Sequence, residues 1–268
     1  MMKTKPFLIF AICALLQSCY IADAQIVWLS TKNADFTECD QEEREVEPFD
    51  AVTNTCPFDV IYEQTDKQYV IVEGDGDYFD NLHTDVYKGV LEIKIDPARY
   101  RNVRLRVRVG SPRITQITMS GSGWILCESD IETDDDLAIR VSGSGDITTN
   151  NVKCGNLETS LSGSGDIRMV CVDAGNVDLN MAGSGDWRAT QLKAEDMNIT
   201  LAGSGDINIA SIDIENSLSA SVAGSGDIRI NGQANNVKAK VVGSGDISGR
   251  LKYEHITKVK SGSGDIDW

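Results

Sequence analysis

The sequence predicts an all-β protein whose main part is a parallel β-helix, a solenoid with coils of about 20 residues. Three observations predict this fold. The tripeptide Gly-Ser-Gly recurs eight times at steps of 19 to 22 residues, aspartate follows it in seven copies, and apolar and polar residues alternate around it. Alternation with a period of two is typical of strands, and self-similarity at a fixed period is typical of a solenoid.

Each predicted coil contains one copy of the tripeptide. The copies occupy residues 121–123, 143–145, 163–165, 183–185, 203–205, 224–226, 243–245 and 262–264. The alternation excludes a helical repeat, and a propeller blade would need about 40 residues. A leucine-rich repeat would show an asparagine ladder, which we do not find in the sequence. Equivalent strands of successive coils should therefore stack about 4.8 Å apart.

The glycines of the repeat are expected to be structural corners. Glycine adopts positive φ at little cost, so paired glycines at a fixed phase indicate a sharp turn or a close approach of two backbones. Serine and aspartate can bond nearby backbone N–H groups, as they do in turns. The expected corners are Gly143, Gly145, Gly163, Gly165, Gly183, Gly185, Gly203, Gly205, Gly224, Gly226, Gly243 and Gly245.

The aspartates of the repeat are candidate calcium ligands. Stacked coils would place them in one row, where neighbouring charges about 4.8 Å apart repel by roughly 0.9 kcal/mol in water. Hydrogen bonds from serine and backbone N–H groups would offset this repulsion. Bound Ca²⁺, which prefers oxygen ligands, would offset it as well. The row consists of Asp146, Asp166, Asp186, Asp206, Asp227, Asp246 and Asp265. We expect no other cofactor.

The N-terminus indicates export. Lys3 and Lys5 precede the apolar run 7–16, which is too short to span a bilayer and is typical of a cleaved secretory signal. We favour cleavage after Ala24, which makes residues 1–24 a signal peptide. The alternative is lipidation of Cys19, which follows Leu16-Gln17-Ser18 as in a lipoprotein box. The expected location is the periplasm, the outer membrane surface or the extracellular space.

The residues between the signal and the repeat divide into two segments. Residues 25–43 lack strand periodicity and are expected to be a leader or linker. Residues 44–110 contain strand-like segments at 58–64, 69–73, 90–95 and 103–109 and are expected to begin the same solenoid, which the repeat continues over 111–268. Arg101, Arg104, Arg106 and Arg108 form a local basic face, since the last three alternate with apolar residues. This face is either a strand face paired with acidic residues or a site for an acidic ligand. In the last round, Lys258 and Lys260 replace apolar residues and indicate a cap or a bulge.

Cysteine content agrees with export but leaves the pairing open. Cleavage after Ala24 leaves five cysteines, so at least one is unpaired within the chain. Cys39 and Cys56 are the best candidates for a disulfide because both lie in the irregular N-terminal stretch. Alternatively, the cysteines are small apolar side chains that are inert where buried.

Charge and composition exclude several functions. The chain has 25 Lys and Arg against 41 Asp and Glu, a formal charge of −16, which would repel a nucleic-acid backbone. Its two histidines stand in no zinc-binding spacing. After the signal no uninterrupted apolar stretch of about 18 residues follows, so we expect no transmembrane helix.

The repeats carry a family resemblance. The Ser-Gly-Ser-Gly-Asp-Ile and Ala-Gly-Ser-Gly-Asp-Ile motifs resemble the head GIN domain of putative auto-transporter adhesins, and the match covers Arg44 to Trp268. The upstream segments that share it are Arg44-Glu45-Val46, Pro48-Phe49-Asp50, 58–64, 70–75, 89–93 and Pro112-Arg113-Ile114. The resemblance implies a right-handed β-helix in the cell envelope and an adhesive function, with no catalytic residues.

Three functions remain open. We favour a non-enzymatic envelope protein that binds a surface, a glycan or a protein ligand. The second is a polysaccharide-active enzyme, for which Asp186 or Asp206 in the middle of the rod would be the only candidates. Catalysis needs carboxylates in different environments, whereas the repeat supplies nearly identical units. The third is a calcium-responsive structural module.

Overall fold

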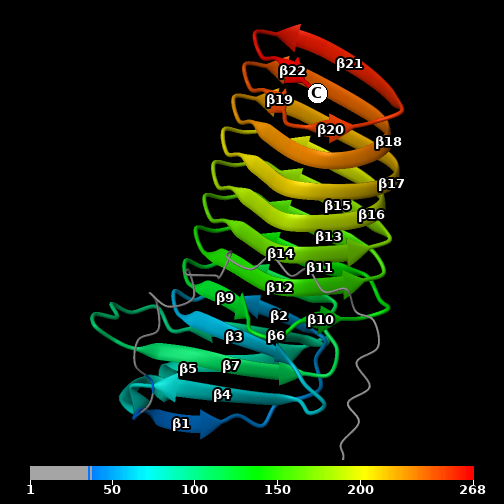
Figure 1. The fold of residues 1–268 in the computed structure, drawn as a ribbon. Helices are drawn as coiled ribbons and strands as arrows, with labels where there is room; N and C mark the ends of the chain where they lie inside the picture. The colour runs from blue at the N-terminus through cyan, green and yellow to red at the C-terminus, as the bar shows by residue number, and fades with distance from the viewer. Residues whose placement is uncertain (1–35, 37) are drawn as a thin grey trace, which may run out of the picture. The chain divides into compact units, whose positions relative to one another are not determined.

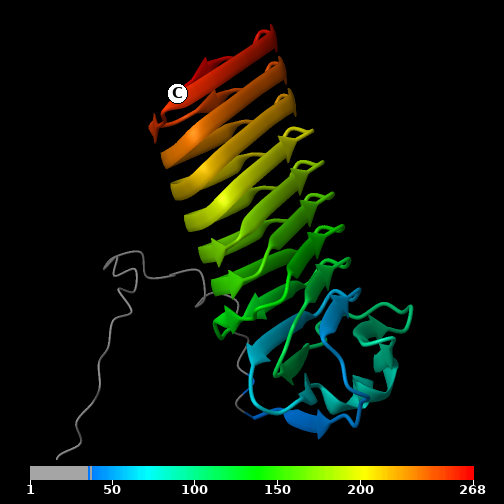
Figure 2. The same cartoon turned by 90° about the vertical axis from the view of Figure 1, so that its right-hand side faces the viewer.

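The computed structural model describes residue 36 and residues 38–268, which form strands almost throughout (Figure 1). The predicted fold class is confirmed, because parallel coils of about 20 residues stack into a β-solenoid of about 8 turns. Figure 2 shows the coils lying one above another. The predicted signal peptide, with Cys19, and most of the predicted linker lie outside the described residues.

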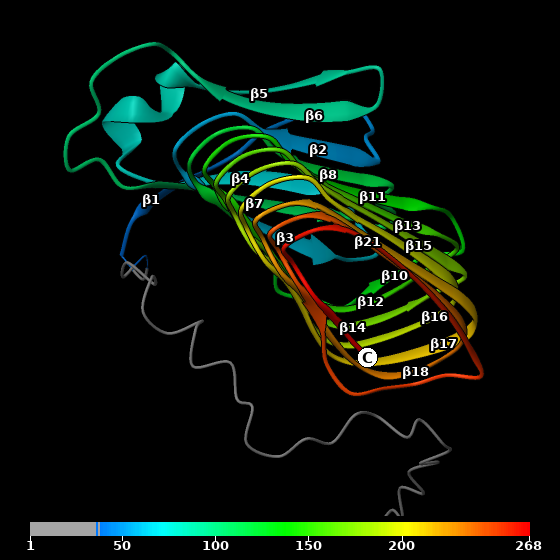
Figure 3. The ribbon, with the colours of Figure 1, turned by 90° about the horizontal axis from the view of Figure 1, so that it is seen from above.

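Each repeat coil has one strand before the Gly-Ser-Gly-Asp motif and one after it. In the lower repeat coils these strands are separate: β8 (Gln116–Met119), β9 (Trp124–Cys127), β10 (Ile131–Glu132), β11 (Leu137–Val141), β12 (Asp146–Cys154), β13 (Leu157–Leu161), β14 (Ile167–Ala174) and β15 (Asn176–Met181). Higher up, one strand runs from motif to motif: β16 (Trp187–Leu201), β17 (Ile207–Gly224) and β18 (Ile228–Gly243). These strands bend around the stack, as the view from above shows (Figure 3).

Register between coils follows the sequence period. β12 and β14 pair in parallel with Ile147 opposite Ile167, one 20-residue step apart, and β14 and β16 continue with Trp187 opposite Ile167. Because the same phase points inward in every coil, these three side chains are fully buried in one apolar core that extends through the stack. The period of two continues through the motif, where Gly145 is buried and Ser144 is exposed.

The N-terminal part adds coils whose order in the stack differs from their order in the chain. β2 (Ala51–Asn54) pairs in parallel with both β6 (Val90–Ile95) and β8. β3 (Asp59–Gln64) pairs in parallel with both β7 (Leu105–Ser111) and β9. The coil built from β2 and β3 therefore lies between the coil built from β6 and β7 and the first repeat coil. After β1, the chain first forms the second level from β2 and β3. It then forms the lowest level from β6 and β7, and then the third level from β8 and β9.

Antiparallel strands cover the lower edge of this base. β4 (Tyr69–Gly74) pairs with β7 and with β1 (Asp40–Glu43), and β5 (Leu82–Tyr87) forms a hairpin with β6. The short 3-10 helix η2 (Gly76–Asn81) connects β4 to β5. β1 lies in the segment expected to be a linker. Its four residues are all polar and exposed, so its pairing depends on the backbone and has no apolar signature.

At the other end, the last coil keeps the regular register. β21 (His255–Gly262) pairs in parallel with β18, and Lys258 and Lys260 stand opposite the buried Ala239 and Val241. The backbone therefore does not bulge there, contrary to one of the two expectations. The remaining short strands are β19 (Ile247–Ser248), β20 (Leu251–Lys252) and β22 (Ile266–Asp267).

The two lysine side chains form the cap themselves. Lys258 Nζ donates to the carbonyl oxygen of Trp268 at 2.8 Å, and Lys260 pairs with the carboxylate of Asp265. Both lysines are exposed because no coil lies above them in the structure. Inward-facing charges on an edge strand oppose pairing with a second edge.

Replacing both lysines with valine should cause association between chains. Lys258→Val with Lys260→Val would extend the apolar interior to the exposed edge, where a second edge could cover it. We expect light scattering after gel filtration to show a concentration-dependent increase in mass. The control is Lys238→Val with Lys240→Val, which changes two exposed outward positions of β18. A double variant at the edge with the mass of the unaltered protein would show that the lysines do not serve this purpose.

Candidate functional site

The motif glycines lie above one another at one corner of the coils. A Cβ added to Gly185 would lie 1.8 Å from the carbonyl oxygen of Gly165, and one added to Gly165 would lie 1.9 Å from that of Gly145. Of the twelve expected corner glycines, only Gly243 has φ in the left-handed range, at 136°. Close approach of two backbones therefore explains the glycines, and positive φ contributes only at Gly243.

The aspartate after each motif accepts a hydrogen bond from the next coil. Asp146 Oδ1 accepts the backbone N–H of Asp166 at 2.9 Å, and each later aspartate up to Asp246 repeats this contact at 2.7–3.0 Å. We call this row, Asp146 to Asp265, the aspartate ladder. Below it, Asp59 Oδ1 accepts the N–H of Trp124, whose indole cannot continue the row, and Asp146 N–H bonds to the carbonyl oxygen of Gly123 instead.

Arginines two residues after the aspartates offset part of the charge. Arg188 Nη2 lies 2.6 Å from Asp186 Oδ2, and Arg168 pairs with Asp166 and lies 3.5 Å from Asp146. The strand alternation causes this pairing, since residues two apart share a face. Backbone N–H donors thus contact the first six aspartates of the row, and arginines pair with Asp146, Asp166 and Asp186.

Calcium binding to the ladder stays a prediction. Each coil contributes a single ladder carboxylate, and one oxygen of each of the first six already accepts an N–H from the coil above. Within the part of the chain that the structure describes, no three His, Cys, Asp or Glu side chains are arranged to hold a metal ion together.

A second ladder, shorter and mixed in composition, runs along another corner. The backbone N–H and Nδ2 of Asn156 both donate to Asp136 Oδ1, at 3.0 and 2.8 Å, and Asn176 repeats both bonds to Asn156 Oδ1. This mixed row is not the asparagine ladder of a leucine-rich repeat, but the sequence analysis did not find it. The row was missed because it contains only two asparagines. Its signal is the 20-residue spacing of Asp136, Asn156 and Asn176.

The arginine stripe of β7 pairs with acidic neighbours. Arg106 Nη2 lies 2.5 Å from Glu73 Oε2, and Arg108 contacts Glu63. Arg104 Nη2 lies 3.7 Å from Asp75 Oδ1. Of the two alternatives for this stripe, the structure shows the paired strand face.

The predicted disulfide between Cys39 and Cys56 does not form in the structure. Cys56 is a buried thiol whose Sγ lies 2.9 Å from Asn54 Oδ1, within the turn between β2 and β3. Cys39 precedes β1, which pairs with β4 at the lower edge. Burial raises the pKa of Cys56 to about 11 and that of the fully buried Cys127 to about 12, so both thiols stay protonated and unreactive at neutral pH.

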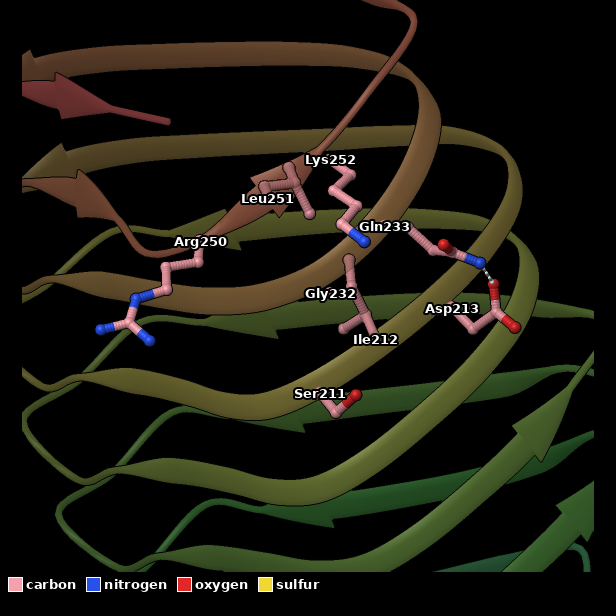
Figure 4. A pocket seen from close by; sticks show the side chains of 8 residues that line it. All are labelled: Ser211, Ile212, Asp213, Gly232, Gln233, Arg250, Leu251 and Lys252. Carbon is pink, nitrogen blue, oxygen red and sulfur yellow. Dashed lines mark hydrogen bonds between the residues drawn. The ribbon is translucent and has the colours of Figure 1, made fainter.

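A groove of about 540 Å³ lies near the upper end of the stack (Figure 4). It is lined by Ser211, Ile212, Asp213, Gly232, Gln233, Arg250, Leu251 and Lys252. The groove forms at a point where β18 has one residue fewer than β17. Two residues separate Ile209 from Ile212 in β17, whereas one residue separates their partners Ile230 and Gly232 in β18. Gly232 therefore takes an interior position that Ile212 fills one coil below. Its φ of 129° lies in the range that favours glycine.

The groove has a signal in the sequence that the motif pattern alone does not reveal. Steps between motifs shorten to 19 residues after residue 224, and Gly232 falls at the phase where earlier coils have Val172, Leu192 and Ile212. The aspartate ladder and the groove lie on different parts of the coil. The groove is concave and has space for a ligand.

This geometry defines a class of protein, the parallel β-solenoid with a glycine and aspartate corner in nearly every coil. The chain matches the family model described as putative auto-transporter adhesin, head GIN domain, over residues 48–234 and 211–268. The chain therefore belongs to this family, and the resemblance seen in its motifs is confirmed.

Solved structures share the fold. A putative lipid binding protein from Parabacteroides distasonis is 26% identical, with a TM-score of 0.75 over 86% of this chain and 96% of that chain. A putative adhesin from the same species is 22% identical, with a TM-score of 0.78 and the same coverage. A putative adhesin from Bacteroides fragilis is 22% identical, with a TM-score of 0.69 and the same coverage. No curated protein matches the chain.

Among the described residues, no helix is long and apolar enough to cross a membrane.

Replacing Gly185 with alanine should destabilise the protein strongly. The added Cβ would overlap the Gly165 carbonyl at 1.8 Å, and only a shift of the backbone could relieve the overlap. We expect a loss of about 2–4 kcal/mol, in the range of severe overpacking, measured by urea unfolding. The control, Ser184→Ala, changes the exposed residue of the same motif and should leave the free energy of unfolding within about 0.5 kcal/mol. Equal stability of the two variants would contradict the close-approach explanation.

Two variants of Asp206 distinguish the hydrogen-bonding role of the ladder from the effect of its charge. In the unaltered protein the backbone N–H of Asp227 donates to Asp206 Oδ1 at 3.0 Å. Asp206→Asn keeps this acceptor, whereas Asp206→Ala removes it. We expect the asparagine variant to be as stable as the unaltered protein and the alanine variant to lose about 0.5–1.5 kcal/mol in urea unfolding. If the asparagine variant were the less stable of the two, the carboxylate charge would matter more than the backbone bond.

Proposed function

We propose that the protein is a non-enzymatic adhesin of the cell envelope, exported by its N-terminal signal, that binds a surface, a glycan or a protein ligand. Family membership carries this proposal. The charged N-terminus and apolar run of residues 7–16 support export through the secretory pathway.

The outer faces of the coils suit contact with a polymer or a surface. On the strands before the motif, outward positions form rows of polar side chains in register. One row contains Glu158, Asp178 and Asn198, and the next contains Ser160, Asn180 and Thr200. Such rows present donors and acceptors at the spacing of the strands, about 4.8 Å.

The structure also supports a role for the ladder that is not catalytic. Asp186 and Asp206, the two candidates for an enzyme, make the same contact, since each accepts the backbone N–H of the aspartate above it. Asp186 also pairs with Arg188, so the two environments are not identical. The backbone contact that both share favours a structural role for both residues.

A binding screen with the full chain tests the proposal. Immobilised glycans, matrix proteins and lipid vesicles would be offered in calcium and again in EDTA, with vesicles included because one structural relative is named as a putative lipid binding protein. We expect saturable binding to at least one glycan or protein, with no release of reducing sugar ends from bound polysaccharide. Release of reducing ends would favour the polysaccharide-active alternative. Absence of binding to every glycan and protein would contradict adhesion.

The comparison of calcium with EDTA also tests the third function, a calcium-responsive structural module. A calcium-responsive module would melt at a clearly higher temperature in calcium than in EDTA, because a ligand that binds the native state stabilises it. The hydrogen bonds of the ladder lead us to expect equal melting temperatures.

A further inference from the structure

Positive charge is concentrated at the upper end of the solenoid. The last 41 residues, 228–268, hold seven Lys and Arg against four Asp and Glu, a net charge of +3, although the whole chain carries −16. These residues form the two uppermost coils, from β18 to β22. The rod is therefore acidic along most of its length and basic at one end.

Most basic residues of this end differ in their partners from the arginines of the middle of the described chain. All seven arginines between residues 104 and 188 form ion pairs. In contrast, Arg229, Lys238, Lys240, Arg250 and Lys252 have no carboxylate within 4.0 Å in the described part of the chain. In a chain with a large excess of acids, cations without acidic partners are available for an external anion.

Two of these cations lie at the groove. Figure 4 shows Arg250 at one edge, with its side chain directed away from the other lining residues, and Lys252 near Gln233 and above Gly232 and Ile212, with Leu251 between the two cations. Ile212 is buried and Leu251 is half-buried, so the floor is apolar. Asp213 and Gln233, joined by a hydrogen bond of 2.8 Å, complete the polar side.

A second hollow on the same face provides a contrast. It has a volume of about 240 Å³ and is lined by Lys153, Asp173, Lys193, Glu195 and Glu215 among others. Lys193 Nζ lies 3.8 Å from Glu215 Oε1, so the charges of this hollow are partly paired within the protein. The upper groove is larger and has two cations for one carboxylate.

We propose that the upper groove binds acidic sugar residues of an anionic polysaccharide. Arg250 and Lys252 would bind the carboxylates of neighbouring sugar residues, because charge-assisted hydrogen bonds are the strong polar contacts of such sites. Asp213, Gln233 and Ser211 would bind ring hydroxyls, and Ile212, Gly232 and Leu251 would contact the apolar face of the ring. Asp213 favours a sugar over a phosphate group, since its carboxylate accepts hydrogen bonds from ring hydroxyls, which inorganic phosphate lacks. This inference rests on the proposed adhesive function and names its ligand class.

The test uses the full chain with an oligogalacturonate of about six residues and the same oligosaccharide methyl-esterified, which keeps the hydroxyls and removes the charge. Isothermal titration calorimetry should show binding of the acid that weakens as salt is raised, and at least tenfold weaker binding of the ester. Arg250→Gln and Lys252→Gln should each weaken binding of the acid by roughly tenfold or more. Lys193→Gln, in the same outward row of residues, is the matched control and should leave the affinity unchanged.

Folding of the variants is checked by circular dichroism melting. Both positions are exposed, so melting temperatures should not change. Equal binding of acid and ester, or unchanged affinity in both groove variants, would overturn the inference. Binding to phosphatidylglycerol vesicles without binding to the oligosaccharide would overturn it in favour of a membrane surface.

The two proposals fail differently. If the protein binds another glycan or a matrix protein in the screen but not the oligogalacturonate, the groove assignment falls and the adhesin proposal stands. If an anionic oligosaccharide binds and is cleaved, the non-enzymatic function falls while the location of the site can still be tested with the groove variants.

Discussion

Direct stacking of backbone on backbone at the motif corner is the constraint on which the rest of the structure depends. The carbonyl of one glycine occupies the place where a Cβ of the next would stand, as Gly165 and Gly185 show. This contact holds successive coils in register, which in turn aligns the interior side chains and brings each ladder carboxylate within reach of the next N–H. A like-charge row thereby becomes a row of hydrogen-bond acceptors.

The repeat could be predicted from the sequence because the recurring motif shows the coil length and the position of the corner, and the alternation around it shows the strands. The base could not, because β2 and β6 are short apolar strands with nothing to show their level in the stack. β1 was missed because its residues are all polar. For the ladder, the residue types allowed either N–H donors or cations as partners of the aspartates, and only the register places the donor 2.7–3.0 Å from each carboxylate.

The candidate site illustrates how a solenoid acquires a distinct surface. Identical coils offer identical surfaces, so a site that occurs only once requires a departure from the repeat. Here the departure is a single missing residue before Gly232, together with a change in charge over the last coils. Both were visible in the sequence as a 19-residue step and a group of basic residues, but their coincidence in one groove depends on which faces the residues occupy.

The crossed order of the lowest three levels makes the two ends of the rod unequal. Above the base, each coil contacts only its neighbours, so whole coils could be added or removed without disturbing distant ones. Below, β2 and β3 have unpaired lower edges until residues about 40 positions later in the chain arrive beneath them. Closing such loops is slow compared with adding adjacent coils. Assembly from the base upward would therefore give the rod a defined foot, and evolutionary changes in its length would be confined to the part above it.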